Sequence, residues 1–128
     1  MRILLDTCTF LWLTGGDPEL SERACEAIVD ASNQVYLSPI SVWEIVIKQA
    51  LGRLTLKLPA DRLVPEQRER HRVESLPVTE YAALQLGKLP PLHRDPFDRM
   101  LVSQSIAEAC VIATPDPLIR QYPVATIW

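Results

Sequence analysis

Glycine is scarce in this chain, which has only four among 128 residues. A glycine-rich loop that cradles a nucleotide phosphate is therefore not expected, because such loops place several glycines within a few positions. The serines at positions 38, 41 and 103 also lack a Gly-x-Ser-x-Gly setting and the partners of a catalytic triad. The sequence thus argues against P-loop enzymes and against serine hydrolases of the nucleophile-elbow type.

Histidine and cysteine are also rare, with two and three residues respectively. His71 and His93 are far apart and have no metal-ligand spacing, so the sequence does not predict a zinc site. Three cysteines cannot all pair, and none belongs to a Cys-x-x-Cys motif. We interpret Cys25 and Cys110 as small buried apolar residues. Cys8 has no general base or arginine at a recognisable spacing, so we do not expect it to be a nucleophile.

Long hydrophobic runs are missing as well. No apolar stretch approaches the roughly 20 residues of a membrane span. The chain passes from Met1 and Arg2 straight into a short apolar run, without the apolar core and cleavage site of a signal peptide. Its composition, 48% hydrophobic and 23% charged, is ordinary for a globular domain. We expect a single domain covering residues 1–128, located in the cytoplasm.

Apolar residues follow helix or strand periodicities along most of the chain. Serine, threonine or proline at the start of several amphipathic segments is typical of helix N-termini. The predicted strands are 3–5, 35–37, 73–76, 111–113 and 124–127. The predicted helices are 7–13, 21–31, 39–51, 79–86, 97–109 and 117–121. This alternation predicts an α/β domain with a parallel sheet and covering helices.

Residues 53–72 give the weakest pattern. Leucine alternates with other residues over 54–58, as in a short extended edge strand. Pro59 and Pro65 bracket a short predicted helix. The charge-rich stretch 66–72 is predicted to be a solvated face or a loop.

Four acidic residues, Asp6, Glu44, Asp98 and Asp116, fall where predicted strands give way to helices. Ligands gather beyond the carboxyl ends of the strands in a parallel sheet, so carboxylates far apart in sequence can meet there. Like charges at close range are unfavourable unless a cation neutralises them. Oxygen-only ligands favour a hard cation such as Mg²⁺ or Mn²⁺. The pattern therefore predicts metal-dependent phosphoryl chemistry.

Each acid also has a simpler interpretation. Asp6 could cap the helix that follows it, and Glu44 could face solvent on an otherwise apolar helix. Asp116 lies between two prolines and could also be a cap. The joint pattern is stronger than any single member, because all four fall at strand-to-helix transitions. Thr7 could donate a hydrogen bond that orients the Asp6 carboxylate.

Asp95 and Asp98 differ in how well a structural role explains them. Pro96 pushes Asp95 out of helical geometry and makes it a natural N-cap. Asp98 falls after the helix has begun, where no cap is needed. We therefore predict Asp98 as a metal ligand and Asp95 as a cap or a supporting residue.

The net charge of −3 argues at first against a nucleic-acid substrate, but the location of charge matters more than its sum. Lys48, Arg53, Arg94 and Arg99 lie close in sequence to the acids and could contact phosphates. They could equally be solvated or form local ion pairs. His93 could help Arg94 to bind phosphate, although we expect it to be an exposed loop residue.

At these positions the chain resembles the PIN-domain family, specifically the VapC-type toxins of bacterial toxin–antitoxin pairs. The matching segments are 4–7, 37–45, 93–101 and 114–117, and the residues from 122 to 128 also fit. The short motifs are weak singly and specific in combination and order, and the resemblance covers essentially the whole chain. Two positions depart from it: Pro115 stands where a small residue is more usual, and Cys8 follows the first motif where other residues are common.

The resemblance implies a three-layer α/β/α fold around a central parallel sheet. It also implies a Mg²⁺- or Mn²⁺-dependent ribonuclease toxin with Asp6, Glu44, Asp98 and Asp116 as its acidic cluster, of which Asp6 and Asp98 are the expected direct ligands. A homodimer and a cognate antitoxin that covers the site are implied as well.

Two other functions stay open at this point. One is a non-catalytic PIN-like binding module. The other is an aspartate-dependent phosphatase with Asp6 as nucleophile, although Cys8 stands where the usual second acid would be.

Overall fold

A five-stranded parallel sheet forms the centre of the computed structural model, which describes residues 1–128. The strand order is β3-β2-β1-β4-β5, and every neighbouring pair is parallel. The strands are β1 (Arg2–Leu5), β2 (Gln34–Leu37), β3 (Val73–Ser75), β4 (Val111–Ala113) and β5 (Thr126–Ile127). The predicted three-layer α/β/α fold is confirmed. The last strand is shorter than its apolar pattern suggested.

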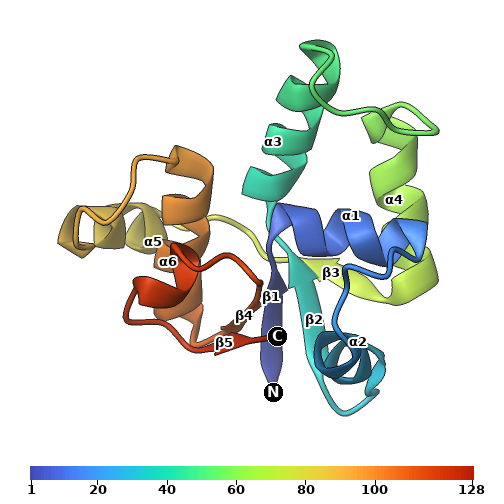
Figure 1. Ribbon diagram of the computed structural model, residues 1–128. Helices are drawn as coiled ribbons and strands as arrows, with labels where there is room; N and C mark the ends of the chain where they lie inside the picture. The colour runs from blue at the N-terminus through green and yellow to red at the C-terminus, as the bar shows by residue number, and fades with distance from the viewer.

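Six α-helices and two short 3₁₀ turns connect the strands (Figure 1). The helices are α1 (Thr7–Gly15), α2 (Glu22–Val29), α3 (Pro39–Ala50), α4 (Ala60–His71), α5 (Glu80–Gln85) and α6 (Pro96–Glu108). The 3₁₀ turns are η1 (Leu86–Lys88) and η2 (Ile119–Gln121). Except that 117–121 is a 3₁₀ turn, this order matches the predicted alternation. None of the helices combines the length and the apolar character that crossing a membrane requires.

Side-chain caps fix where several helices begin. Ser21 accepts a hydrogen bond from the Ala24 amide, and Thr79 accepts one from the Ala82 amide. Ser38 caps α3 and is followed by a proline at the first helical position. These caps satisfy amide groups that have no partner within the helix, so the predicted starts of these helices are correct.

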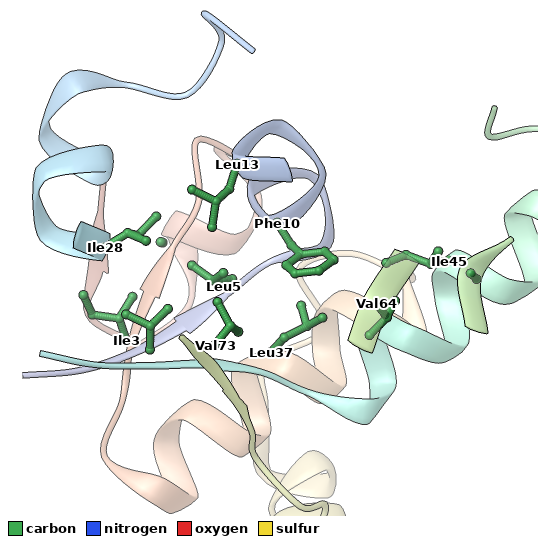
Figure 2. Close-up of a cluster of buried hydrophobic side chains, with 12 residues drawn as sticks. Ile3, Leu5, Phe10, Leu13, Ile28, Leu37, Ile45, Val64 and Val73 are labelled. Atoms are coloured by element: carbon green, nitrogen blue, oxygen red, sulfur yellow. The ribbon is translucent and has the colours of Figure 1, made fainter. Parts of the chain in front are cut away.

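The central strand β1 separates two apolar clusters, because successive side chains of a strand point to opposite faces. Ile3 and Leu5 pack with Phe10 of α1 on one face, in a cluster of 12 buried residues that also takes in α2 and α4 (Figure 2). Leu4 packs on the other face with Leu101 of α6. A strand buried on both faces is expected for a parallel sheet. Strand β1 is therefore packed against apolar side chains on both faces of the sheet.

The prediction for residues 53–72 was correct only in part: a helix does follow Pro59, and several charged side chains of 66–72 are exposed, but the helix is longer than predicted. Residues 53–72 form no strand, and α4 runs without a break through Pro65 to His71. Leu63, Val64 and Gln67 are buried at helical spacing against the sheet, whereas Pro65 is exposed. Tertiary packing of this face outweighs the roughly 3 kcal/mol that an internal proline costs a helix. Leu54 and Leu56 pack against the core as parts of an irregular segment.

Candidate active site

The carboxyl ends of β1, β2 and β4 meet at one edge of the sheet. Leu5 is level with Leu37 and with Ala113, so the residues that follow these strands come close together. A pocket of about 350 Å³ lies at this edge. Among the predicted residues, its lining includes Asp6, Thr7, Glu44, Lys48, Arg53, Asp95, Asp98 and Asp116. The structure thus brings the four acids from four parts of the chain into one pocket.

Asp6 is both a helix cap and a wall of the pocket. Its side chain is buried, with 4% of the residue surface exposed. One carboxylate oxygen, Oδ1, accepts hydrogen bonds from the Thr9 amide at 2.8 Å and from the Cys8 thiol at 3.2 Å. The other oxygen, Oδ2, accepts one from the Thr114 hydroxyl. Capping and a place in the pocket are therefore compatible for this residue.

Glu44 is equally buried, at 4% exposure, and each of its carboxylate oxygens accepts a hydrogen bond. The Thr7 hydroxyl donates to its Oε1 at 2.5 Å, and the Lys48 ammonium donates to its Oε2. This hydrogen bond raises the pKa of Lys48 against the opposing effect of burial, and the charges of Glu44, Asp95 and Asp98 raise it further. Thr7 therefore orients Glu44, whereas we expected it to orient Asp6.

Asp95 and Asp98 divide their roles as their positions suggest. Asp95 caps α6, and its Oδ1 accepts from the amides of Phe97 at 2.9 Å and Asp98 at 3.2 Å. The Asp98 carboxylate accepts only from His93, at 3.3 Å. Burial raises the pKa of Asp98 to about 7, and the charges of Asp95, Asp116 and Glu44 act in the same direction. The cluster thus carries negative charge that its own residues do not neutralise.

Asp116 follows β4 and shapes the turn before η2. Its Oδ1 accepts from the Leu118 amide at 2.8 Å, and its own amide donates to Thr114 at 3.1 Å. The side chain is partly exposed and lines the pocket. Turn formation leaves its second carboxylate oxygen without a hydrogen-bond partner in the protein.

The four predicted phosphate-contacting residues lie in different places. Lys48 and Arg53 line the pocket. Arg94 is exposed and does not line it. The Arg99 guanidinium donates instead to the Pro90 carbonyl and to the Tyr122 hydroxyl, both at 2.9 Å. Two of the four, Lys48 and Arg53, therefore lie where the prediction requires, and the other two do not.

Sequence reasoning missed two features of the site. Thr114 follows β4 level with Asp6, and its place directly after an apolar strand was a signal that could have found it. His93 was expected to be exposed, but only 10% of its side chain is accessible, because it packs between Asp98 and Tyr122. Tyr122 lies 29 residues away along the chain, and no sequence pattern pointed to this contact.

Cys8 lines the same pocket but does not have the properties of a nucleophile. Burial raises the pKa of its thiol well above the ordinary value, and the neighbouring Asp6 carboxylate raises it further. The thiol therefore stays protonated and donates to Asp6.

The pocket residues suit a hard divalent cation by their chemistry, although they do not form a closed metal cage. The carboxylates offer oxygen ligands, which Mg²⁺ and Mn²⁺ prefer. Burial is the main cause of the raised pKa of Asp98, and the negative charges of Asp95, Asp116 and Glu44 add to it. A bound cation would favour the ionised carboxylate against both effects. No three histidine, cysteine, aspartate or glutamate side chains are grouped so as to hold an ion as they stand.

The chain belongs to the PIN domain family, whose profile matches residues 3–124. Membership of this family indicates a nuclease, and hence a hydrolase. No curated protein matches the sequence significantly.

Several solved structures share the fold over nearly the whole chain. VapBC2 from Rickettsia felis, bound to a promoter DNA fragment, has a TM-score of 0.75 at 16% identity, covering 99% of this chain and 98% of that chain. DNA-bound VapBC from Salmonella typhimurium has a TM-score of 0.71 at 18% identity, covering 99% and 97%. The PIN domain endonuclease Utp24 has a TM-score of 0.50 at 18% identity, covering 94% and 74%. At these identities the likeness is one of fold.

Proposed function

We propose that the protein is a divalent-metal-dependent endoribonuclease that acts as the toxin of a toxin–antitoxin pair. The observation that carries this proposal is the convergence of Asp6, Glu44, Asp98 and Asp116 on one pocket of a PIN domain. The sequence resemblance to VapC-type toxins and the fold shared with VapBC complexes support the toxin role.

Asp6 and Asp98 would hold the metal ion, and Glu44 and Asp116 would orient the attacking water. A bound Mg²⁺ or Mn²⁺ ion supplies two things, a lowered pKa for water and neutralisation of charge on the phosphate. Asp6 is fixed by three hydrogen bonds, so its position is set before any ligand arrives. Asp116 has a free carboxylate oxygen at the open side of the pocket, which suits it to contact water.

Lys48 and Arg53 would bind the RNA phosphates on either side of the scissile bond. Both line the pocket, and Lys48 retains 44% exposure of its side chain while paired with Glu44. Cationic side chains at the rim raise the local concentration of a polyanion although the whole chain is acidic. The overall charge of −3 is therefore compatible with an RNA substrate.

The proposal extends to partners and location. A cognate antitoxin would bind this chain and block the pocket, and two copies of the chain would form a dimer in the cytoplasm. Tyr81 and Leu84 lie one turn apart on α5 with 61% and 68% exposure, and such an apolar pair is suited to burial against a second copy.

Cleavage of a pool of cellular RNA tests the proposal. Purified protein is incubated with RNA and Mn²⁺, then with EDTA, and then as the Asp98→Asn variant. Asp61→Asn is the matched control, since Asp61 is an exposed acid on α4 outside the pocket. We expect cleavage by the wild type and the control only, and only with metal. Cleavage that persists in EDTA, or in a folded Asp98→Asn protein, would contradict the assignment.

Two alternatives predict different results. A non-catalytic module would bind RNA or protein without metal-dependent cleavage. An aspartate-dependent phosphatase would release phosphate from a small phosphoester, but Cys8 stands where the usual second acid of such an enzyme would be.

A further inference from the structure

A partly buried network of hydrogen bonds ends on the Asp98 carboxylate. The Arg99 guanidinium donates to the Tyr122 hydroxyl at 2.9 Å. The same hydroxyl lies 2.8 Å from Nδ1 of His93, and Nε2 of His93 lies 3.3 Å from Oδ2 of Asp98. Tyr122 is 3% exposed and packs in a small core cluster with residues of α6, β4 and η2. This hydrogen-bond network thus links the core beside α6 to the pocket.

The direction of each hydrogen bond follows from the chemistry of its members. A guanidinium can only donate, so the Tyr122 oxygen accepts from Arg99. The hydroxyl proton is then available to His93, and Nδ1 is its acceptor. In the neutral imidazole the remaining proton is therefore on Nε2, from which it is donated to Asp98.

The opposite tautomer would leave two groups without a proper partner. With its proton on Nδ1, His93 would donate to Tyr122, whose own proton would then have no acceptor in a buried site. Nε2 would present a lone pair to the ionised Asp98 carboxylate, the form that can hold a metal ion, and the two would repel each other. Both consequences are unfavourable, because a polar group removed from water without a partner loses hydrogen bonds that the protein does not replace.

The orientation of the Asp98 carboxylate depends on this hydrogen-bond network more than the orientation of Asp6 or Glu44 depends on any single partner. His93 donates the only hydrogen bond that the Asp98 carboxylate receives. Asp6, by contrast, accepts from three groups, and Glu44 accepts from two. The orientation of the Asp98 carboxylate is therefore set largely from one side.

We propose that Arg99, Tyr122 and His93 are positioning residues that fix the His93 tautomer and thereby orient the Asp98 carboxylate for the metal ion. This inference rests on the proposed function, since it assigns the hydrogen-bond network a role in that same site. His93 occupies Oδ2 of Asp98 and leaves Oδ1 free for a ligand in the pocket. Partners beyond the direct ligands of a metal commonly act in this way, and their loss weakens metal affinity by 10- to 100-fold.

A spectroscopic measurement tests the tautomer without any nuclease assay. The ring nitrogens of ¹⁵N-labelled, metal-free protein are observed by NMR at about pH 8 and again at a higher pH, so that the signals of the neutral imidazole are identified. The chain has only two histidines, so His71→Gln suffices to assign the signals. We expect Nε2 of His93 to be protonated and Nδ1 to be unprotonated. Protonation of Nδ1 would overturn the proposal.

Tyr122→Phe separates the hydroxyl from the packing of the ring. Tyr36→Phe is the matched control, because Tyr36 is also buried and its hydroxyl donates a single hydrogen bond, to Gln34, far from the pocket. In Tyr122→Phe we expect the His93 signals to shift toward a mixture of tautomers and the Mn²⁺ affinity to fall by roughly 10-fold. Tyr36→Phe should leave both unchanged. Equal behaviour of the two variants would overturn the proposal.

Two substitutions of His93 sharpen the test. The amide of glutamine can reach the position of Nε2 and donate to Asp98, whereas the shorter asparagine side chain cannot. We expect His93→Gln to retain Mn²⁺ affinity and kcat better than His93→Asn, with similar KM for RNA. If both variants fold and lose affinity equally, His93 does not act by donating to Asp98.

Failure of the proposed function would be distinguishable from failure of this inference. Wild-type protein that neither binds Mn²⁺ nor cleaves RNA would contradict the proposed function. It would also contradict the role of the hydrogen-bond network in holding Asp98 for a metal. Wild-type protein that binds and cleaves, with Tyr122→Phe indistinguishable from Tyr36→Phe, would contradict the inference alone.

Discussion

The pocket has two halves that hold their carboxylates in different ways. In the half formed by β1 and α3, Asp6 and Glu44 are buried, and every carboxylate oxygen accepts at least one hydrogen bond. In the half formed by α6 and the segment after β4, Asp98 receives one long hydrogen bond and Asp116 keeps one oxygen free. We call these the bonded half and the open half.

The difference separates structural from electrostatic roles within one acidic cluster. The bonded half helps hold the fold together, because Asp6 caps α1 and joins it to β4 through Thr114. In the open half, burial raises the pKa of Asp98, and the charges of neighbouring carboxylates raise it further. Stability should therefore depend mainly on the first half and the response to pH mainly on the second, whereas a metal ion held by Asp6 and Asp98 would contact both.

Loss of Asp98 should have the largest effect on activity and a small one on folding. We expect Asp98→Asn to reduce metal-dependent cleavage by more than about 100-fold, because even residues that only support a metal ligand contribute 10- to 100-fold. Circular dichroism and thermal unfolding should show an intact fold. An active Asp98→Asn enzyme would remove the functional meaning of the open half.

Loss of Asp6 should affect folding as well as activity. Asp6→Ala removes the cap of α1 and leaves the Thr114 hydroxyl without its buried partner, so we expect the free energy of unfolding to fall by about 2–3 kcal/mol. Urea denaturation of Asp6→Ala beside Asp98→Ala measures the difference. Equal losses in the two variants would abolish the distinction between the halves.

The metal-free protein should become less stable as pH rises from about 4 to about 7, because Asp98 loses its proton in the folded state only near the upper value. The folded pKa of Asp98, about 7, lies above the unfolded value, so its favourable contribution is full below about pH 4 and is lost by about pH 7. Asp98→Asn lacks this loss. After allowance for solvent access, its advantage over the wild type should grow by on the order of 1 kcal/mol between these pH values. A constant difference across the range would contradict the raised pKa.

Lys48 should give the smallest effects. Its ion pair with Glu44 is partly exposed, so Lys48→Gln should change stability by less than about 1 kcal/mol. If Lys48 also contacts RNA, Lys48→Gln should make the plot of log binding constant against log salt concentration less steep, by the amount expected for about one phosphate contact. Lys88→Gln, a change of an exposed lysine outside the pocket, is the control. Identical salt slopes for the two variants would exclude Lys48 from the RNA contact.

The order of strands and helices could be predicted because it is written in local patterns. Apolar runs such as 3–5 mark strands, and Ser38 before Pro39 marks a helix start. The gathering of the acids followed from one geometric rule, that parallel strands end at a common edge. These features need no knowledge of distant contacts.

The features that could not be predicted depend on contacts between distant segments. Helix α4 continues through Pro65 because its buried face packs on the sheet, and local propensity points the other way. The turning of Arg99 toward Tyr122 and of Thr7 toward Glu44 likewise depends on the folded geometry. Residue type alone marked these side chains as polar, without indicating which partner each would take.

A calorimetric titration of the metal-free protein with Mn²⁺ tests most directly whether the acidic pocket binds a metal ion through Asp98. Wild type and Asp61→Asn should bind with the same Kd, and Asp98→Asn should bind more than about 100-fold more weakly. An unchanged Kd in Asp98→Asn, or no binding by the folded wild type, would contradict the proposal that this acidic pocket holds the metal of a nuclease.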